Sequence, residues 1–388
     1  MNSFIYDIPT KVYFGENQLG HLSEELYKYG KRVLLTYGGG SVKKIGLYDR
    51  IMEQLAAAGL EVYELSGIEP NPRIETVRAG VQLCKKYQID VLLAVGGGST
   101  IDATKFMAAG ALVEHDPWDF FVNGAPIEKA LPIVTVLTMA ATGSEMDNIG
   151  VISNMETRDK IGKGSPLLQP KVSFLDPTLT YSVGKYQTAC GAADIFSHIM
   201  ETYFTREDDL FMLDCVMEGL MKTVIKYGPI ALNEPDNYEA RANLMWASSW
   251  AINGFVMGGK RKVWSCHAME HQLSAVYDIT HGLGLAILMP RWLEYCLNEE
   301  TLSKYVQFGV NVFGVDPALP AMEIAKESIR LLRVFLFELL GLDDTFTKIG
   351  IEEKEFPAMA QKACKGKKIA GFQTLYPQDV ENIYKMCL

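Results

Sequence analysis

The stretch Asp90-Val91-Leu92-Leu93-Ala94-Val95-Gly96-Gly97-Gly98-Ser99 decides the fold of this chain. Its first six residues form a short, nearly continuous apolar run, which is typical of a β-strand covered on both faces. The glycines that follow mark a tight loop, and a helical pattern then continues to about Ala109. A strand, a glycine loop and a helix in this order predict a parallel βαβ unit whose ligands bind at the carboxyl end of the strand.

The rest of the first half repeats this alternation of strands and helices. Helical patterns separate the strands, and after about Thr188 the pattern becomes helical throughout. We therefore expect an α/β nucleotide-binding domain over residues 1–185 and an all-α metal-binding domain over residues 186–388. The strands are expected at 33–37, 61–65, 90–95, 132–137 and 172–175, and the later helices at 190–205, 211–232, 238–257, 264–277, 284–298, 301–313, 320–341, 352–364 and 378–387.

Composition narrows the classes of partner. The chain has 388 residues, 48% of them hydrophobic, and a net charge of −10 without blocks of like charge, which argues against nucleic acid and anionic membranes. The seven cysteines include no C-x-x-C pair, so reduced thiols are expected. The N-terminus does not resemble a signal peptide, and the longest apolar stretch, about 130–141, is too short to span a bilayer. These features predict a cytoplasmic protein.

Two glycine loops follow predicted strands. Gly97, Gly98 and Ser99 open a helix whose free amides suit a phosphate, and Asp102 lies in its first turn. Gly38-Gly39-Gly40-Ser41 forms a second such loop after an earlier strand. Either loop alone can equally be a tight turn that needs small residues, and the G-x-G-x-x-G fingerprint is absent. Two such loops at one sheet favour an extended ligand such as a dinucleotide.

A third strand exit carries hydroxyl groups. Thr138, Thr142 and Ser144 follow the strand at 132–137. Such hydroxyls can bind a ligand, but Ser and Thr also cap helices, so this segment alone decides nothing.

Four of the six histidines fall between residues 194 and 281. Asp194 and His198 are spaced i, i+4, as are His267 and His271, and this spacing places each pair on one face of a helix. With His281 they offer a carboxylate and imidazoles, a donor set that suits Fe²⁺ or Zn²⁺. A single histidine is more often a structural residue, but the clustering favours a metal site. Spacing leaves open which of His267 and His271 is a ligand.

Together these motifs resemble the iron-containing (group III) alcohol dehydrogenases, and in particular their butanol dehydrogenase-like branch. The resemblance covers almost the whole chain. It rests on Pro9–Gly15, Tyr37–Ser41, Gly67–Pro72, Gly96–Ser99, Ala141–Glu145, Ala193-Asp194 with His198, and Trp264–Gly284.

The resemblance implies a dehydroquinate synthase-like architecture and roles for particular residues. It implies that Asp194, His198, His267 and His281 are the metal ligands, and that His271 is a catalytic proton relay near the nicotinamide. It implies a cofactor path with the pyrophosphate at Gly97, Gly98 and Ser99 and the adenosine ribose at Gly38, Gly39, Gly40 and Ser41. The remaining expected cofactor-binding residues are Asn71, Asp102, Thr138, Thr142, Ser144 and Lys160.

Cofactor choice depends on the loop expected at the ribose. Relatives that prefer NAD resemble one another in having an acidic residue there, whereas this chain has Gly40-Ser41 with Lys43-Lys44 nearby. A positive environment attracts a 2′-phosphate, so NADP(H) is favoured over NAD(H), although related butanol enzymes are described as using NADH.

The resemblance predicts reversible hydride transfer between a nicotinamide and a short-chain primary alcohol or aldehyde, such as butanol or butanal, by a homodimer. Cys266 before His267, and Asp278-Ile279-Thr280 before His281, depart from the broad family pattern and bear on the substrate range. Two alternatives share some of the motifs. One is a dehydroquinate synthase-like or glycerol dehydrogenase-like enzyme on the same fold, and the other is a nucleotide-binding protein with a structural metal.

Overall fold

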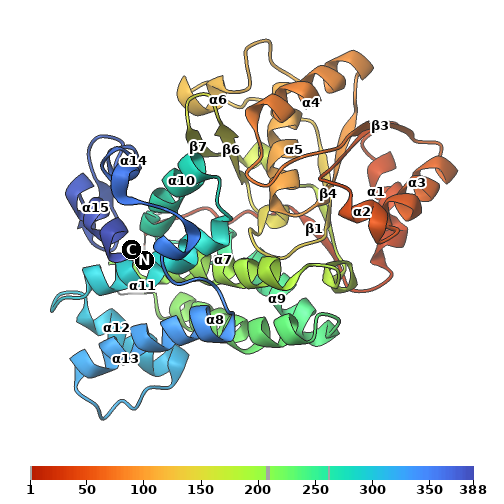
Figure 1. The fold of residues 1–388 in the computed structure, drawn as a ribbon. Helices are drawn as coiled ribbons and strands as arrows, with labels where there is room; N and C mark the ends of the chain where they lie inside the picture. Colours follow the sequence, from red (N-terminus) through yellow and green to blue (C-terminus); the bar gives the residue numbers. More distant parts are fainter. Residues whose placement is uncertain (1, 207–209, 261–262) are drawn as a thin grey trace. The chain divides into compact units, whose positions relative to one another are not determined.

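The computed structural model describes residues 2–206, 210–260 and 263–388, and these form two compact units. The sheet unit consists of Asp7–Val183 and Asp236–Asn253. The helical unit consists of the described residues before Asp7, together with those in Gly184–Pro235 and Gly254–Leu388. Figure 1 draws both units as a ribbon and labels the α-helices and several strands of the sheet unit.

The sheet unit contains a six-stranded parallel sheet in the order β1-β8-β5-β4-β2-β3. After β2 the chain adds β3 at the edge and then crosses back to place β4 on the other side of β2. The carboxyl ends of β2 and β4 therefore form a topological switch point, where parallel sheets bind ligands. The strands are β1 (Lys11–Phe14), β2 (Arg32–Tyr37), β3 (Glu61–Leu65), β4 (Val91–Gly96), β5 (Ile133–Leu137) and β8 (Val172–Leu175).

The strands of this sheet bury side chains on both faces because helices cover each side. Val33 and Leu35 pack with α1 (Leu22–Tyr27) and α3 (Leu47–Ala57), whereas Leu34 between them packs on the opposite face. That opposite face is covered by α4 (Ile74–Tyr87) and α5 (Gly98–Gly110). The short helices α2 (Ser41–Lys44) and α6 (Asp119–Val122) complete this part of the unit.

The helical unit consists mainly of α-helices around a buried α7 (Lys185–Tyr203). Of its residues from Thr188 to Tyr203, every one is buried. α8 (Phe211–Asn233) and α11 (His281–Cys296) pack on α7, and α10 (Ser265–Tyr277) packs on α11. Its other α-helices are α12 (Leu302–Phe313), α13 (Ala321–Arg333), α14 (Phe356–Ala363) and α15 (Pro377–Met386), and β9 (Ile369–Ala370) and β10 (Thr374–Leu375) form a two-stranded sheet.

The structure differs from the expected domain limits at two places. Residues 236–253, expected in the all-α domain, belong to the sheet unit because α9 (Tyr238–Ile252) packs there. Met245 of α9 packs with Ala94, Leu137 and Leu175, which lie at or near the carboxyl ends of three strands. Asn2 and its neighbours, expected in the first domain, belong to the helical unit, where the Asn2 amide donates to Gly259 O.

Three strand pairings were not expected from the sequence. β1 is a short edge strand whose residues are half-buried or exposed, so it lacks a strong apolar pattern. β6 (Ile149–Asn154) and β7 (Asp159–Gly164) form an antiparallel hairpin in which β7 reads Asp-Lys-Ile-Gly-Lys-Gly. β9 and β10 have two residues each, too few for periodicity to show. Among the described residues, no helix combines the length and apolarity needed to cross a membrane.

Candidate active site

The helix α7 presents Asp194, His198 and Glu201 on one buried face, because the spacings i, i+4 and i+7 fall about a turn apart. His198 Nε2 lies 3.6 Å from Asp194 Oδ1. Burial and the neighbouring histidines keep the pKa of His198 well below its ordinary value, so its imidazole is neutral and keeps a lone pair for a cation.

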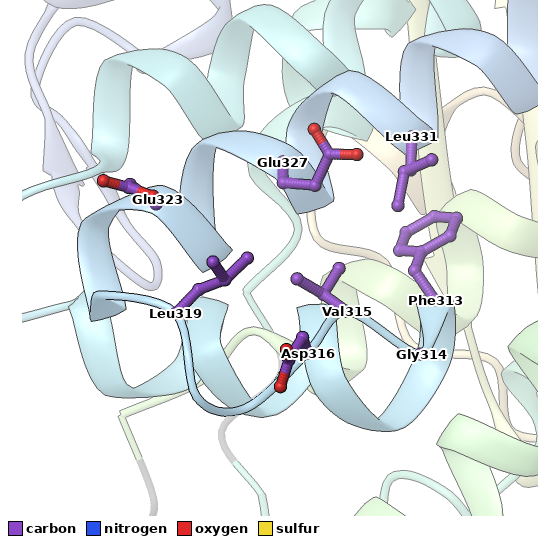
Figure 2. A pocket seen from close by; sticks show the side chains of 8 residues that line it. All are labelled: Phe313, Gly314, Val315, Asp316, Leu319, Glu323, Glu327 and Leu331. Carbon is purple, nitrogen blue, oxygen red and sulfur yellow. The ribbon is translucent and has the colours of Figure 1, made fainter.

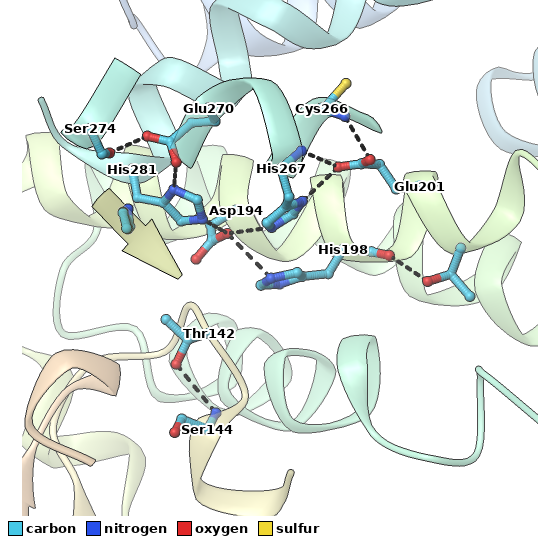
Figure 3. A network of polar contacts seen from close by, with 12 residues as sticks. Thr142, Ser144, Asp194, His198, Glu201, Cys266, His267, Glu270, Ser274 and His281 are labelled. Carbon is cyan, nitrogen blue, oxygen red and sulfur yellow. Dashed lines mark hydrogen bonds and ion pairs between the residues drawn. The ribbon is translucent and has the colours of Figure 1, made fainter. Parts of the chain in front are cut away.

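Two more helices bring histidines to the same carboxylate. His267 lies in the first turn of α10, and His281 is the first residue of α11. His267 Nε2 is 3.9 Å and His281 Nε2 is 3.8 Å from Asp194 Oδ1 (Figure 3). One ligand atom each of Asp194, His267 and His281 lies within 4.8 Å of the others, which is the spacing of a metal site. The structure thus brings the four proposed metal ligands together.

A glycine allows His281 to approach α7. A Cβ added at Gly282 would lie 2.1 Å from the backbone oxygen of Cys190, so only glycine fits at this contact. Before this contact, Asp278 ends α10 in the left-handed region at φ 51°, which turns the chain into α11. The start of α11 therefore depends on residues that are not ligands.

Two buried glutamates, which the sequence analysis did not single out, hold the rings of His267 and His281. Glu201 Oε1 accepts a hydrogen bond of 2.6 Å from His267 Nδ1, and Glu270 Oε2 accepts one from His281 Nδ1. Each glutamate follows a proposed ligand by three residues on its helix, at His198-x-x-Glu201 and His267-x-x-Glu270. That i, i+3 spacing was the available sequence signal.

The donor set fits a divalent cation. Asp194, Glu201 and Glu270 are 3%, 2% and 0% exposed, and burying several carboxyl groups together is costly unless positive charge lies among them. His267 Nε2, the ring nitrogen that faces Asp194, is buried and forms no hydrogen bond with the described residues. Buried polar atoms of this kind need a partner. A carboxylate with three imidazoles suits Fe²⁺ or Zn²⁺.

His271 lies one turn after His267 on α10 and is half-buried. Its ring centroid is 6.3 Å from that of His267 and 5.6 Å from that of His281. One ligand atom each of Glu270, His271 and His281 also lies within 4.8 Å of the others, so this set is a second candidate for a metal group. The structure therefore places His271 beside the predicted ligands.

In the sheet unit, the loop between β4 and α5 is closely packed. A Cβ added at Gly98 would lie 2.1 Å from Thr142 Oγ1, and one at Gly97 would be 3.4 Å from Met139 Cβ. The Thr138 amide donates to Gly96 O at 3.0 Å. The structure therefore brings together the predicted pyrophosphate loop, Gly97 to Ser99, with Thr138 and Thr142.

Asp102 and Ser144 join these loops internally. Ser144 Oγ donates to Asp102 Oδ1 at 2.6 Å, and the Val151 amide donates to Asp102 Oδ2 at 2.9 Å. Both side chains are buried, and burial raises the pKa of Asp102 to about 6. They connect α5 to the segment after β5, and their contact with a cofactor stays a prediction.

Lys160 and Asn71 form a further pair in the sheet unit. Lys160 Nζ of β7 donates to Asn71 Oδ1 at 2.9 Å, and both residues belong to the expected cofactor set. Asn71 has φ 52°, a conformation that asparagine tolerates better than most residues.

The Gly38–Ser41 loop follows β2, next to the end of β4. A Cβ added at Gly39 or Gly40 meets no atom within 4 Å, so the loop is open at these two glycines, although a Cβ at Gly38 would lie 3.2 Å from Ile68 O. Beside it, Tyr37 and Tyr48 each donate a 2.8 Å hydrogen bond to Glu64. Lys43 Nζ lies 5.2 Å and 4.4 Å from the ring centroids of Tyr37 and Tyr48. This aromatic cluster was not expected from the sequence.

A hollow of about 400 Å³ lies elsewhere in the helical unit, where α12 turns into α13 (Figure 2). It contains none of the predicted site residues. Its lining consists of Phe313, Gly314, Val315, Asp316, Leu319, Glu323, Glu327 and Leu331.

A parallel sheet with glycine loops at its switch point, and a helical unit with an Asp/His metal constellation, define the class of metal-dependent dehydrogenases with a dehydroquinate synthase-like fold. Two family models together match most of the chain. The iron-containing alcohol dehydrogenase model matches residues 9–177, and the C-terminal model of the Fe-containing alcohol dehydrogenase family matches residues 188–388. The chain therefore belongs to the iron-containing alcohol dehydrogenase family.

Individual relatives agree with this assignment. The chain is 50% identical to NADH-dependent butanol dehydrogenase A of Clostridium acetobutylicum, over 99% of each chain. It is 38% identical to the NADPH-dependent aldehyde reductase YqhD of Escherichia coli, over 93% of each. The crystal structure of NADH-dependent butanol dehydrogenase A from Thermotoga maritima superposes with a TM-score of 0.95 at 38% identity, covering 100% of this chain and 99% of the other. The expected fold class and the resemblance to the butanol dehydrogenase-like branch are confirmed.

Proposed function

We propose that this chain catalyses reversible hydride transfer between a nicotinamide dinucleotide and a short-chain primary alcohol or aldehyde, such as butanol or butanal. The observation that carries the proposal is the approach of His198, His267 and His281 to a single oxygen of Asp194. The alcohol dehydrogenase family supplies the reaction class, and the relatives named for butanol and aldehydes supply the substrate class.

The proposed metal is Fe²⁺, with Zn²⁺ as the alternative, held by Asp194, His198, His267 and His281. When bound, such a cation supplies Lewis acidity toward an alcohol or aldehyde oxygen, and the nicotinamide supplies or accepts the hydride. Asp194 contributes negative charge and the histidines contribute neutral nitrogen donors. Asp194, His198 and His267 are buried, which limits the access of water and strengthens their electrostatic effect, whereas His281 is half-buried.

His271 is proposed to move the proton that accompanies hydride transfer. It is half-buried and lies next to the rings of His267 and His281, so it has access to both solvent and the ligand cluster. A histidine is suited to this role because its ordinary pKa lies near neutrality.

The proposed cofactor is bound by the predicted loops of the sheet unit, with NADP(H) favoured over NAD(H). The Gly38–Ser41 loop lacks an acidic residue and is open at Gly39 and Gly40, and Lys43 lies in α2, which begins at Ser41. Two observations oppose this preference: Glu64 is held nearby by Tyr37 and Tyr48, and several relatives are named as NADH-dependent enzymes. A homodimer and a cytoplasmic location complete the proposal, and sedimentation and cell fractionation test them.

The decisive experiment compares His281→Ala and His271→Ala with the unaltered chain in metal content and NADPH-dependent butanal reduction. His281→Ala should lose bound metal and activity together. His271→Ala should keep its metal and lose activity, by about 10²–10⁴-fold for a general acid–base group. Full activity of His281→Ala without metal would refute the proposed site. Cofactor binding without turnover of any short aldehyde would favour a nucleotide-binding protein with a structural metal.

A further inference from the structure

The two glutamates beside the proposed ligands are placed to control which nitrogen of each histidine is protonated. A carboxylate only accepts hydrogen bonds, so the proton must lie on Nδ1 of His267, facing Glu201, and on Nδ1 of His281, facing Glu270. With the proton at Nδ1, Nε2 keeps its lone pair. In both rings Nε2 is the atom that faces Asp194 Oδ1, at 3.9 Å and 3.8 Å.

Glu201 also fixes the backbone that carries His267. Its carboxylate accepts hydrogen bonds from the Cys266 amide at 2.8 Å and the His267 amide at 2.9 Å. These amides belong to the first turn of α10, where backbone N–H groups lack partners within the helix. Glu201 on α7 thus determines both where α10 begins and how the His267 ring is turned.

Glu270 plays the corresponding part for His281, which is on a different helix. It is fully buried on α10 and accepts hydrogen bonds from Ser274 Oγ as well as from His281 Nδ1. Glu270 also packs closely on α11, since a Cβ added at Gly284 would lie 2.8 Å from Glu270 Cγ. Glu270 therefore links α10 to the first turn of α11, where His281 lies.

We propose that Glu201 and Glu270 are positioning residues that fix the Nε2 atoms of His267 and His281 toward Asp194 and so determine how tightly the cation is held. This inference rests on the proposed metal site. Partners that orient a metal-binding histidine and raise its basicity are worth about 10–100-fold in metal affinity. Without an acceptor at Nδ1, the proton can occupy either ring nitrogen and the ring can turn.

Glu270→Gln separates charge from hydrogen bonding. A glutamine can still accept from His281 Nδ1 through its oxygen, while its amide group donates to Ser274 Oγ, which accepts as readily as it donates. Glu270→Ala removes both effects. Ser274→Ala is the control that removes one hydrogen bond and leaves the carboxylate beside His281.

Glu201→Gln is a harsher change because the two Glu201 oxygens together face three N–H donors. An amide group in place of one oxygen would face a backbone donor, so this variant also tests the start of α10. Glu218→Gln is the matched control for a buried glutamate of the same unit, because Glu218 accepts from Tyr203 and Gln307 and from none of the proposed ligands.

The test titrates each metal-free protein with Co²⁺, follows the visible d–d absorption, and measures affinity by competition with a chelator. We expect Glu270→Ala to bind Co²⁺ about 10–100-fold more weakly than the unaltered chain and to show an altered d–d spectrum. The affinity of Glu270→Gln should lie between those two. Ser274→Ala and Glu218→Gln should match the unaltered chain. Circular dichroism of each metal-free variant confirms that it is folded.

The outcomes separate this inference from the proposed function. If the unaltered chain binds no Co²⁺, the proposed metal site itself fails. If the unaltered chain binds one ion, and folded Glu270→Ala and Glu270→Gln match it in both spectrum and affinity, the metal site stands and the positioning role is refuted. An equal loss in Glu218→Gln would also refute it, because the effect would then belong to any buried glutamate.

Discussion

Single residues decide whether the ligands can meet, and Gly282 is the clearest case. A Cβ added at Gly282 would lie 2.1 Å from the backbone oxygen of Cys190. We expect Gly282→Ala to move α11 away from α7, to cost about 1–3 kcal/mol of stability, and to weaken metal binding through His281. Gly219 of α8 is the control, since a Cβ there meets no atom within 4 Å and Gly219→Ala should add up to about 1 kcal/mol. Urea denaturation measures the stability of both variants, and metal analysis measures their metal content. Unchanged metal content in Gly282→Ala would contradict this prediction.

Ser41 is the single residue at which cofactor preference can be tested. Ser41 follows the open glycines of the predicted ribose loop, and a carboxylate there would repel a 2′-phosphate. Ser41→Asp should lower kcat/KM for NADPH about tenfold or more, the equivalent of about 1.4 kcal/mol, and change that for NADH much less. Ser41→Asn introduces a side chain of nearly the same shape as Asp but without its charge. It should keep the ratio of kcat/KM for NADPH to that for NADH of the unaltered chain. Equal losses with both cofactors in Ser41→Asp would place the 2′-phosphate elsewhere.

The residues of the site differ in how well the sequence predicted them. Residue type and helical spacing indicated a metal site, the family resemblance then implied Asp194, His198, His267 and His281 as its ligands, and the structure brings these four together. Glu201 and Glu270 were missed because a glutamate on a helix is usually a solvated residue, and only burial reveals their partners. Spacing also could not decide the role of His271, because i and i+4 residues share one face whether they bind the same ion or not.

At the scale of elements, α9 shows what hydrophobic patterning leaves out. A helix was expected at residues 238–257 in the all-α domain, but α9 ends at Ile252 and belongs to the sheet unit, because periodicity shows which face is buried and not which partner buries it. Tertiary contacts place it: Ser249 Oγ donates to Glu145 Oε1 at 2.5 Å, and Met245 packs against the ends of the strands. The β6–β7 hairpin was missed for a related reason, since the polar strand β7 carries no alternating apolar pattern.

The buried contact between α9 and Glu145 should make stability depend on pH. Burial raises the pKa of Glu145 to about 7, despite the hydrogen bond from Ser249, against an ordinary value of 4.5. The folded state therefore binds a proton on Glu145 more readily than the unfolded state does. As the pH rises from about 4.5 through 7, ionisation of Glu145 lowers the free energy of unfolding of the protein. Glu145→Gln cannot ionise, and it should be more stable than the unaltered chain at pH 8, by on the order of 3 kcal/mol, with the difference shrinking toward pH 4.

Melting temperatures at pH 4, 6 and 8 test this expectation. Ser249→Ala provides the opposite control, because it leaves the carboxylate and removes its donor, and should melt below the unaltered chain most clearly at pH 8. A difference between Glu145→Gln and the unaltered chain that stays constant with pH would show that Glu145 does not ionise over this range.

At the scale of the whole molecule, the proposed metal ligands and the proposed nucleotide loops belong to different units. All four ligands lie on α7, α10 and α11 of the helical unit, whereas Gly97 to Ser99 and Gly38 to Ser41 lie in the sheet unit. Removing the metal should therefore loosen the ligand helices selectively. A ligand present at 1,000 times its Kd stabilises a fold by about 4 kcal/mol, which is large enough to detect.

Hydrogen exchange of the metal-free and metal-loaded protein measures this effect. Chelation should raise exchange in peptides from α7, α10 and α11 and leave β4 and α5 unchanged. Re-addition of Zn²⁺ should restore protection, which controls for damage by the chelator. Equal loosening of β4 and α5 would show that the metal stabilises both units alike.

The place of α9 in the chain also has a consequence for synthesis on the ribosome. All six strands of the sheet have been made by Val183, but α9, which packs at the carboxyl ends of β4, β5 and β8, is complete only near Asn253, after the ribosome has also made α7 and α8. At 5–20 residues per second that interval lasts on the order of ten seconds. During this interval the nascent sheet lacks the cover that Met245 later gives to Ala94, Leu137 and Leu175.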